Sequence, residues 1–291
     1  PAATAAVPRD GTGARARRWW RRFARSKGAV FGLAVFMAIV LMAVFAEVLA
    51  PYDPIIQGVG KPLEGPSWAH WAGTDSFGRD MASRIIHGAR IALAVGIVAV
   101  LLAMVVGVAL GLAAGYYGGW LDVVIMRVMD AMFAFPIIIL AIAMMAIIGF
   151  GVINVIIAVA VGFVAPFARV TRGDVLAVKE EPYIEAARLA GIPGPAIIVR
   201  HVLPNVAAPI IVQAALRVSG AIITEAGLSF LGLGPPPPTP VWGSMIAEGR
   251  NFVVMAPHVS TMPGLVLMLA VIGLNLFGDG LRDTLDPRLR R

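Results

Sequence analysis

Residues 180–205, EEPYIEAARLAGIPGPAIIVRHVLPN, form a polar segment between two long apolar runs. Two glutamates precede Pro182, which suits the first position of a helix because its missing N–H would be unsatisfied there anyway. Gly191 can adopt the left-handed conformation that ends a helix, and the prolines after it block continuation. Residues 183–190 would make a rod of about 12 Å. The segment therefore predicts a short helix and turn outside the bilayer, small enough to enter a cleft on another protein.

This segment resembles the EAA loop of bacterial ABC importer permeases, in which Glu-Ala-Ala, a Gly four residues after the second Ala, and a downstream Leu-Pro form a cytoplasmic coupling helix. The resemblance implies that the helix docks into a groove on an ATPase subunit and carries its closing motion into the membrane. The coupling residues that it implies are Tyr183, Glu185, Ala186, Ala187, Leu189, Gly191, Leu203 and Pro204. The alternative is a re-entrant or interfacial helical hairpin without a partner, because Glu-Ala-Ala alone is common in helices.

The composition indicates a polytopic membrane protein. The mean hydropathy is +0.84 and only 14% of the residues are charged, against roughly a quarter in soluble domains. The absence of cysteine excludes disulfides, zinc-thiolate sites and cysteine nucleophiles, and the four histidines lack metal-ligand spacing, so we expect no metal site. The net charge of +7 does not indicate nucleic-acid binding, because the basic residues cluster beside the apolar spans.

Apolar runs of a length suited to a hydrocarbon layer of roughly 30 Å predict an all-α protein with six transmembrane helices. The predicted spans are residues 28–50, 90–116, 121–149, 152–168, 205–233 and 262–281. In the second span, Gly107, Gly111 and Gly115 follow one another at intervals of four, which places bare backbone on one face for close helix contact.

Basic residues set the predicted orientation. They gather before the first span, in the loop with the coupling segment and in the C-terminal tail. Arg169 and Arg172 are assigned to that loop. Because basic residues favour the cytoplasmic side, both termini and the loop are predicted to be cytoplasmic. A secretory signal is the alternative for the first span, but the run is too long and no convincing cleavage site follows. The predicted parts are a basic cytoplasmic tail (1–27), the first helix (28–50), an extracytoplasmic loop (51–89), a permease core (90–283) with the coupling loop (179–204), and a cytoplasmic tail (284–291).

Four charged residues inside predicted spans are candidates for the substrate pathway. Arg127 and Asp130 lie three positions apart on one helical face, which favours a structural or gating ion pair over a ligand site. Arg217 lies near the middle of the fifth span without an acid within one turn, and Glu225 follows eight positions later. Arg217 is therefore the best single candidate for contact with substrate; pairing with an acid on another helix or on a second permease chain is the alternative.

Three further segments resemble the second, "C-type" subunit of the dipeptide and oligopeptide branch, which includes glutathione importers. They are GTDSFGRD (73–80) with ARIAL (89–93), LGLGPPPPTPVWGSMI (231–246) and FGDGLRDTLDPRLRR (277–291). The resemblance implies a type I importer fold, a five-helix core plus an N-terminal helix, in the bacterial inner membrane. It also implies a second homologous permease, two cytoplasmic ATPases that bind ATP and magnesium, and an extracytoplasmic binding protein that delivers a dipeptide, short oligopeptide or glutathione.

No phosphate-binding loop or catalytic motif occurs in the sequence, so we expect no enzyme activity and no cofactor on this chain. ATP hydrolysis then belongs to partner subunits. A secondary transporter is one alternative, but the inverted repeat with matched broken helices that would suggest it is not evident. A second alternative is a scaffold subunit, which needs no coupling helix. A third is an ABC importer subunit for a non-peptide cargo such as a nickel chelate.

Overall fold

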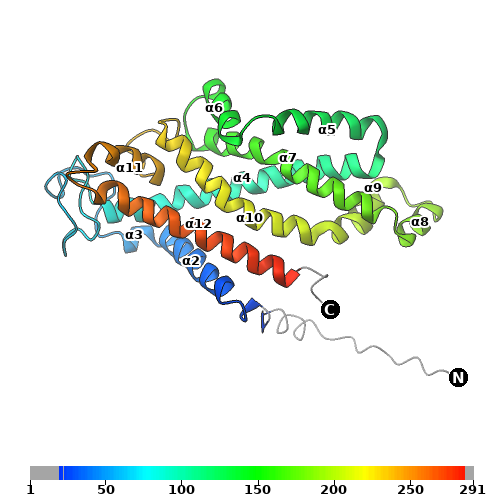
Figure 1. The fold of residues 1–291 in the computed structure, drawn as a ribbon, viewed down its shortest axis with the longest axis horizontal. Helices are drawn as coiled ribbons and strands as arrows, with labels where there is room; N and C mark the ends of the chain where they lie inside the picture. The colour runs from blue at the N-terminus through cyan, green and yellow to red at the C-terminus, as the bar shows by residue number, and fades with distance from the viewer. Residues whose placement is uncertain (1–19, 22, 286–291) are drawn as a thin grey trace.

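The computed structural model describes residues 20, 21 and 23–285, which form an elongated bundle of helices (Figure 1). Within these residues, five helices are long and apolar enough to cross a membrane, and a bent helix pair brings the number to six. The five are α2 (Lys27–Val44), α4 (Met81–Tyr117), α7 (Val152–Val178), α10 (Leu203–Phe230) and α12 (His258–Leu285). The predicted all-α membrane fold is confirmed, and the predicted number of six crossings is reached when the bent pair counts as one broken span.

The third predicted span, residues 121–149, is not one straight helix. It divides into α5 (Gly119–Phe133) and α6 (Ile137–Ile148), whose axes differ in direction by 94°. Pro136 immediately precedes α6. Proline lacks the N–H needed to continue the hydrogen-bond ladder and disfavours helical geometry in the residue before it, so the helix stops at this point.

The fourth predicted span, 152–168, is ten residues too short, because α7 continues to Val178 with Pro166 inside it. Arg169 and Arg172 therefore lie on this helix and not in a loop as predicted. The extra turns bring both arginines alongside α5, where they meet acidic partners.

The packing of α4 against α7 is the core of the bundle and confirms the predicted glycine face. A Cβ placed on Gly107 would lie 2.6 Å from the Cβ of Phe167, and one on Gly111 would lie 2.5 Å from the carbonyl oxygen of Ala168. Side chains cannot be accommodated at such distances. The three glycines spaced by four thus let two backbones approach closely along one seam.

The N-terminal helix packs on the last helix of the chain. The first predicted span corresponds to α2 and a short α3 (Ala46–Leu49), with Phe45 between them. A Cβ on Gly32 of α2 would lie 2.4 Å from the backbone nitrogen of Phe277 on α12, and one on Gly280 would lie 2.2 Å from the Cβ of Ala29. Small residues on both helices therefore permit this contact.

The two ends of the bundle differ in structure (Figure 1). At the loop end, residues 51–80 form a folded loop beside α11 (Trp242–Gly249) and the short 3₁₀ helix Arg250–Phe252. The indole of Trp242 donates a hydrogen bond to the carbonyl of Ile85 on α4 (2.9 Å), which joins α11 to the bundle. At the opposite end, here called the α8 end, are α8 (Pro182–Leu189), α9 (Gly194–Ile197) and a π-helical turn (Ile198–Val202) that leads into α10.

Candidate functional site: an exposed short helix and the charges of the bundle

The short helix predicted from the sequence is α8, and its end is closed by backbone hydrogen bonds. Pro182 occupies its first turn. The N–H of Ile192 donates to the carbonyl of Ala187 (3.2 Å), and the N–H of Gly191 donates to the carbonyl of Arg188 (3.0 Å). This pair of bonds is the Schellman motif, which requires a left-handed residue after the helix; Gly191 supplies it with φ +74°. The sequence therefore fixes both ends of α8.

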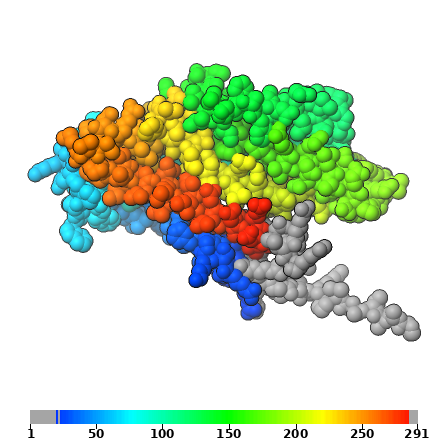
Figure 2. All heavy atoms as spheres, in the orientation of Figure 1, coloured from blue at the N-terminus to red at the C-terminus, as the bar shows by residue number. Residues whose placement is uncertain are grey.

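The helix has one buried and one exposed face. Ile184 and Ala187 are buried and pack in an apolar cluster with residues of α4, α7 and α10. The outer face consists of Tyr183, Glu185, Ala186 and Leu189, and the Leu189 side chain is 83% exposed. In the space-filling view, this segment forms the tip of the α8 end (Figure 2). Of the candidate coupling residues, Ala187 thus packs inward, while its neighbours are available to a partner.

Contacts with α4 hold α8 in place. The Arg188 guanidinium lies 5.3 Å from the centre of the Tyr116 ring, and the Lys179 ammonium donates to the carbonyl of Gly115 (3.2 Å). Leu203 is half-buried and Pro204 is exposed at the start of α10. The predicted Leu-Pro pair therefore marks where the transmembrane helix resumes, so that α8 is joined to two long helices over a short distance.

The pairing predicted between Arg127 and Asp130 is wrong. Asp130 accepts a hydrogen bond from Arg169 of α7 (2.5 Å), and the Arg169 guanidinium also lies 4.1 Å from the centre of the Phe133 ring. Arg127 is exposed and makes no ion pair with any residue that the structure describes. Spacing along one helix showed only that the two charges share a face; the approach of α7 decided which cation Asp130 contacts.

Arg217 lies among neutral groups. With the Gln213 side-chain amide in the orientation that satisfies both residues, its oxygen accepts from Nε and Nη2 of Arg217 at 3.1 Å and 3.0 Å. The guanidinium lies 5.9 Å from the centre of the Phe163 ring. Over residues 20, 21 and 23–285, no carboxylate lies within salt-bridge distance of it. Among the residues that the structure describes, the alternative of an intramolecular acid partner is therefore not realised.

Glu225 is separated from Arg217 and has a different partner. Its side chain is buried and accepts a hydrogen bond from the hydroxyl of Ser229, one turn later on α10, at 2.6 Å. The structure does not bring the four pathway candidates together, because Arg127 and Asp130 lie on α5 while the other two lie on α10. They do not form a single binding site within this chain.

A buried charge network at the loop end was not predicted. Asp75 accepts from the Arg79 backbone N–H and side-chain Nε, at 3.0 Å and 2.5 Å, and Arg79 Nη2 donates to Glu248 of α11 (3.1 Å). Arg84, whose side chain is 1% exposed, lies within 3.7 Å of Glu248 and 3.6 Å of Asp75. The density of charges in GTDSFGRD could have indicated such a network. Its fourth member, Glu248, lies far along the chain and carries no signal in the sequence.

Comparisons with known proteins agree with this architecture. Residues 107–291 match the family model described as "Binding-protein-dependent transport system inner membrane component", and residues 15–66 match the "N-terminal TM domain of oligopeptide transport permease C". The fold is similar to that of the MetNI methionine ABC transporter in an inward-facing conformation, with a TM-score of 0.57 and 20% identity over 71% of this chain and 98% of the other.

Two curated relatives are similar over almost the whole chain. The glutathione transport system permease protein GsiD of Pectobacterium atrosepticum is 49% identical over 94% of this chain and 91% of its own length. The protein of the same name from Escherichia coli is 47% identical over 94% and 90%. The chain therefore belongs to the family of binding-protein-dependent inner membrane transport components, as a multi-pass ABC importer permease of the peptide branch.

Proposed function

We propose that this chain forms half of the translocation pathway of an ATP-driven importer for glutathione, dipeptides or short oligopeptides. The observation that carries the proposal is α8, a short helix with a capped end and an exposed outer face, which lies at one tip of a bundle built on long apolar helices. The curated relatives are named as glutathione transport permeases, which supports a small peptide cargo. A nickel chelate or another small solute is the second candidate cargo.

In the proposed assembly, α8 docks on a cytoplasmic ATPase subunit. The apolar Leu189 and Tyr183 side chains would be buried on docking, and Glu185 would contribute a charged contact at their edge. Ile184 and Ala187 connect this face to the long helices, so that a displacement of α8 moves α4, α7 and α10. A second permease subunit would complete the pathway, and a binding protein would deliver cargo at the loop end.

The proposed orientation puts both termini and α8 in the cytoplasm. Along the bundle, α2 begins and α12 ends on the side toward α8, whereas residues 51–80 and α11 lie at the other end (Figure 1). Basic residues flank the α8 end, which agrees with the positive-inside rule. ATP and magnesium would bind to the ATPase partners, and lipid would surround the apolar helices.

Uptake by the purified complete assembly in proteoliposomes tests the proposal. Glutathione and tripeptides should accumulate only with ATP inside and the binding protein outside, and a protonophore should leave the rate unchanged. Uptake that collapses with the proton gradient and persists without ATP would instead indicate a secondary transporter. A nickel chelate as the only accumulated cargo would retain the ATP-driven importer and replace the peptide assignment.

A further inference from the structure

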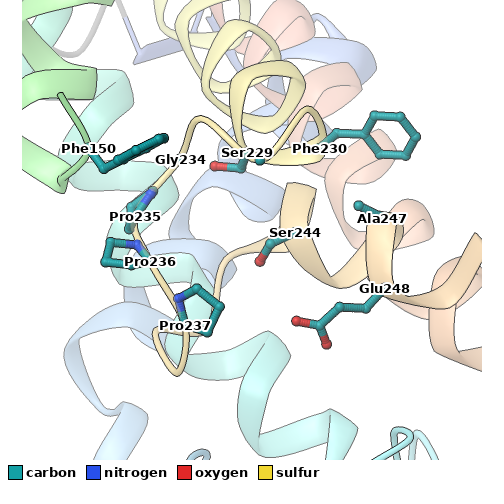
Figure 3. A pocket seen from close by; sticks show the side chains of 11 residues that line it. Phe150, Ser229, Phe230, Gly234, Pro235, Pro236, Pro237, Ser244, Ala247 and Glu248 are labelled. Atoms are coloured by element: carbon teal, nitrogen blue, oxygen red, sulfur yellow. The ribbon is translucent and has the colours of Figure 1, made fainter. Parts of the chain in front are cut away.

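A pocket of about 370 Å³ opens at the loop end, between the end of α10, the proline run and α11 (Figure 3). Its volume lies within the range of roughly 300–1,000 Å³ that is usual for small-ligand sites. The apolar walls come from aromatic rings and prolines, and three polar side chains reach the cavity. The lining includes Phe150, Ser229, the prolines 235–237, Ser244 and Glu248.

The polar side chains of this pocket can accept hydrogen bonds, but their hydroxyl hydrogens are already donated elsewhere. The Ser229 hydroxyl donates to Glu225 (2.6 Å), and the Ser244 hydroxyl donates to the carbonyl of Val241 (3.0 Å). A hydroxyl has one hydrogen and two lone pairs, so each serine offers the pocket only its lone pairs. The prolines 235–238 have no backbone N–H. The lining therefore matches a ligand rich in donors.

Glu248 supplies the charge, and its carboxylate is held by two buried arginines. Arg79 Nη2 lies 3.1 Å and Arg84 Nη2 lies 3.7 Å from the same oxygen, Oε2. Both arginine side chains are at most 4% exposed, whereas that of Glu248 is 29% exposed. Among the described residues, Oε1 accepts no hydrogen bond. In Figure 3 the carboxylate points toward the proline run across the pocket.

We propose that this pocket binds an ammonium group, namely the amino-terminal end of the peptide cargo, as it enters the permease at the loop end. The assignment rests on the proposed function. Charge-assisted N–H···O bonds from an ammonium to Oε1 of Glu248 and to the serine oxygens satisfy three donors at once, and the apolar walls cover the adjoining side chain. A carboxylate in the same place would face the carboxylate of Glu248 and no free hydroxyl hydrogen of Ser229 or Ser244, which disfavours it.

The network behind the pocket keeps this site weak. Asp75 and Glu248 balance Arg79 and Arg84, so that the four groups are neutral before a ligand arrives. Selection for an ammonium therefore comes from the arrangement of acceptors and not from a net negative field. A weak subsite suits an importer, which must pass its cargo onward toward the α8 end.

Ala247, which is half-buried and also lines the pocket, allows a test that leaves Glu248 and its arginines intact. Ala247→Lys places a tethered ammonium beside the carboxylate, and Ala247→Met adds similar bulk without charge. We compare ATP-driven uptake of triglycine and of N-acetyl-triglycine by the complete transporter. The uptake rate of triglycine divided by that of N-acetyl-triglycine should fall roughly tenfold in Ala247→Lys, which is the effect of losing one charge-assisted hydrogen bond. In Ala247→Met this ratio should remain unchanged. Equal ratios in the two variants would overturn the proposal.

A second measurement does not depend on transport. The sequence has no cysteine, so Ser244→Cys introduces a single thiol inside the pocket. Triglycine at millimolar concentration should slow its reaction with a maleimide several-fold, whereas N-acetyl-triglycine should not. Protection without any peptide uptake by the unmodified transporter would retain the ammonium site and reject the proposed cargo. If the unmodified transporter takes up peptide but triglycine and N-acetyl-triglycine leave the maleimide reaction of the thiol equally fast, the ammonium site is rejected and the proposed cargo is retained.

Discussion

The guanidinium of Arg172 on α7 donates two parallel hydrogen bonds to the carboxylate of Asp122 on α5, at 2.9 Å and 2.6 Å. Such a bidentate pair fixes the orientation of both side chains as well as their distance. It joins the start of α5 to the part of α7 that leads toward α8. The α5–α7 seam therefore has two ion pairs, this one and the pair between Asp130 and Arg169.

The two pairs of the seam should differ in their effect on stability. The side chains of Asp122 and Arg172 are 17% and 34% exposed, whereas those of Asp130 and Arg169 are 52% and 51% exposed. Asp122→Asn should cost about 1 kcal/mol, which corresponds to a fall of about 2–4 °C in the melting temperature of the detergent-purified protein. Asp130→Asn, the matched control, should change it less. A larger loss in the control would contradict this ranking.

Charge reversal on the outer face of α8 should uncouple hydrolysis from transport. Glu185 is exposed on that face, so Glu185→Lys should leave folding and membrane insertion intact while it weakens docking to the ATPase. The measurement is the number of ATP molecules hydrolysed per cargo molecule in proteoliposomes. Glu180→Lys, an equal charge change before the helix begins, is the control. Wild-type coupling in Glu185→Lys would remove this residue from the interface.

Gly191 should be sensitive to backbone geometry alone. A Cβ there would meet nothing within 4 Å, but φ is +74°, a conformation that β-branched residues adopt at high cost and asparagine tolerates. Gly191→Val should therefore distort the end of α8 and reduce coupled transport severalfold, and Gly191→Asn should retain most of it. Parallel uptake assays and a check of membrane insertion separate the two. Equal activity of both variants would show that the left-handed turn is not required.

Orientation can be tested with single cysteines, because the sequence contains none. Ala69 in the loop of residues 51–80 and Ala190 at the end of α8 are both exposed, and these two segments lie at opposite ends of the bundle (Figure 1). The thiol of Ala69→Cys should react with a membrane-impermeant maleimide in cells whose outer membrane has been made permeable and whose inner membrane is intact. That of Ala190→Cys should react only when the inner membrane is opened. The reverse pattern would invert the protein and place α8 outside the cytoplasm.

Arg217 should contribute to transport through the cargo carboxylate. Its contacts in the described chain are neutral, so an anionic group in the pathway can use its remaining donors. Arg217→Gln should lower uptake of peptides with a free C-terminus roughly tenfold, the effect of one charge-assisted hydrogen bond, and Arg217→Lys should lower it less. Amidated peptides should be affected little. Equal losses for free and amidated peptides would make Arg217 a packing residue.

Local features of the sequence were sufficient to predict most of the helices. Runs of apolar residues identify membrane crossings because the hydrocarbon layer imposes a minimum length on each helix. Both ends of α8 follow from single residues, Pro182 and Gly191, whose backbone preferences depend little on the rest of the fold. The glycine seam of α4 could likewise be recognised from spacing alone, since a four-residue interval keeps small residues on one helical face.

Contacts between distant segments were decided only by the tertiary structure. The partner of Asp130, the inward packing of Ala187 and the joining of Arg79 to Glu248 all depend on how separate helices approach one another. The ligand preference of the pocket depends in addition on which hydroxyl hydrogens already donate to other groups, as those of Ser229 and Ser244 do. Sequence spacing determines which face of its own helix a side chain occupies, whereas the atoms opposite that face are set by the packing of the whole bundle.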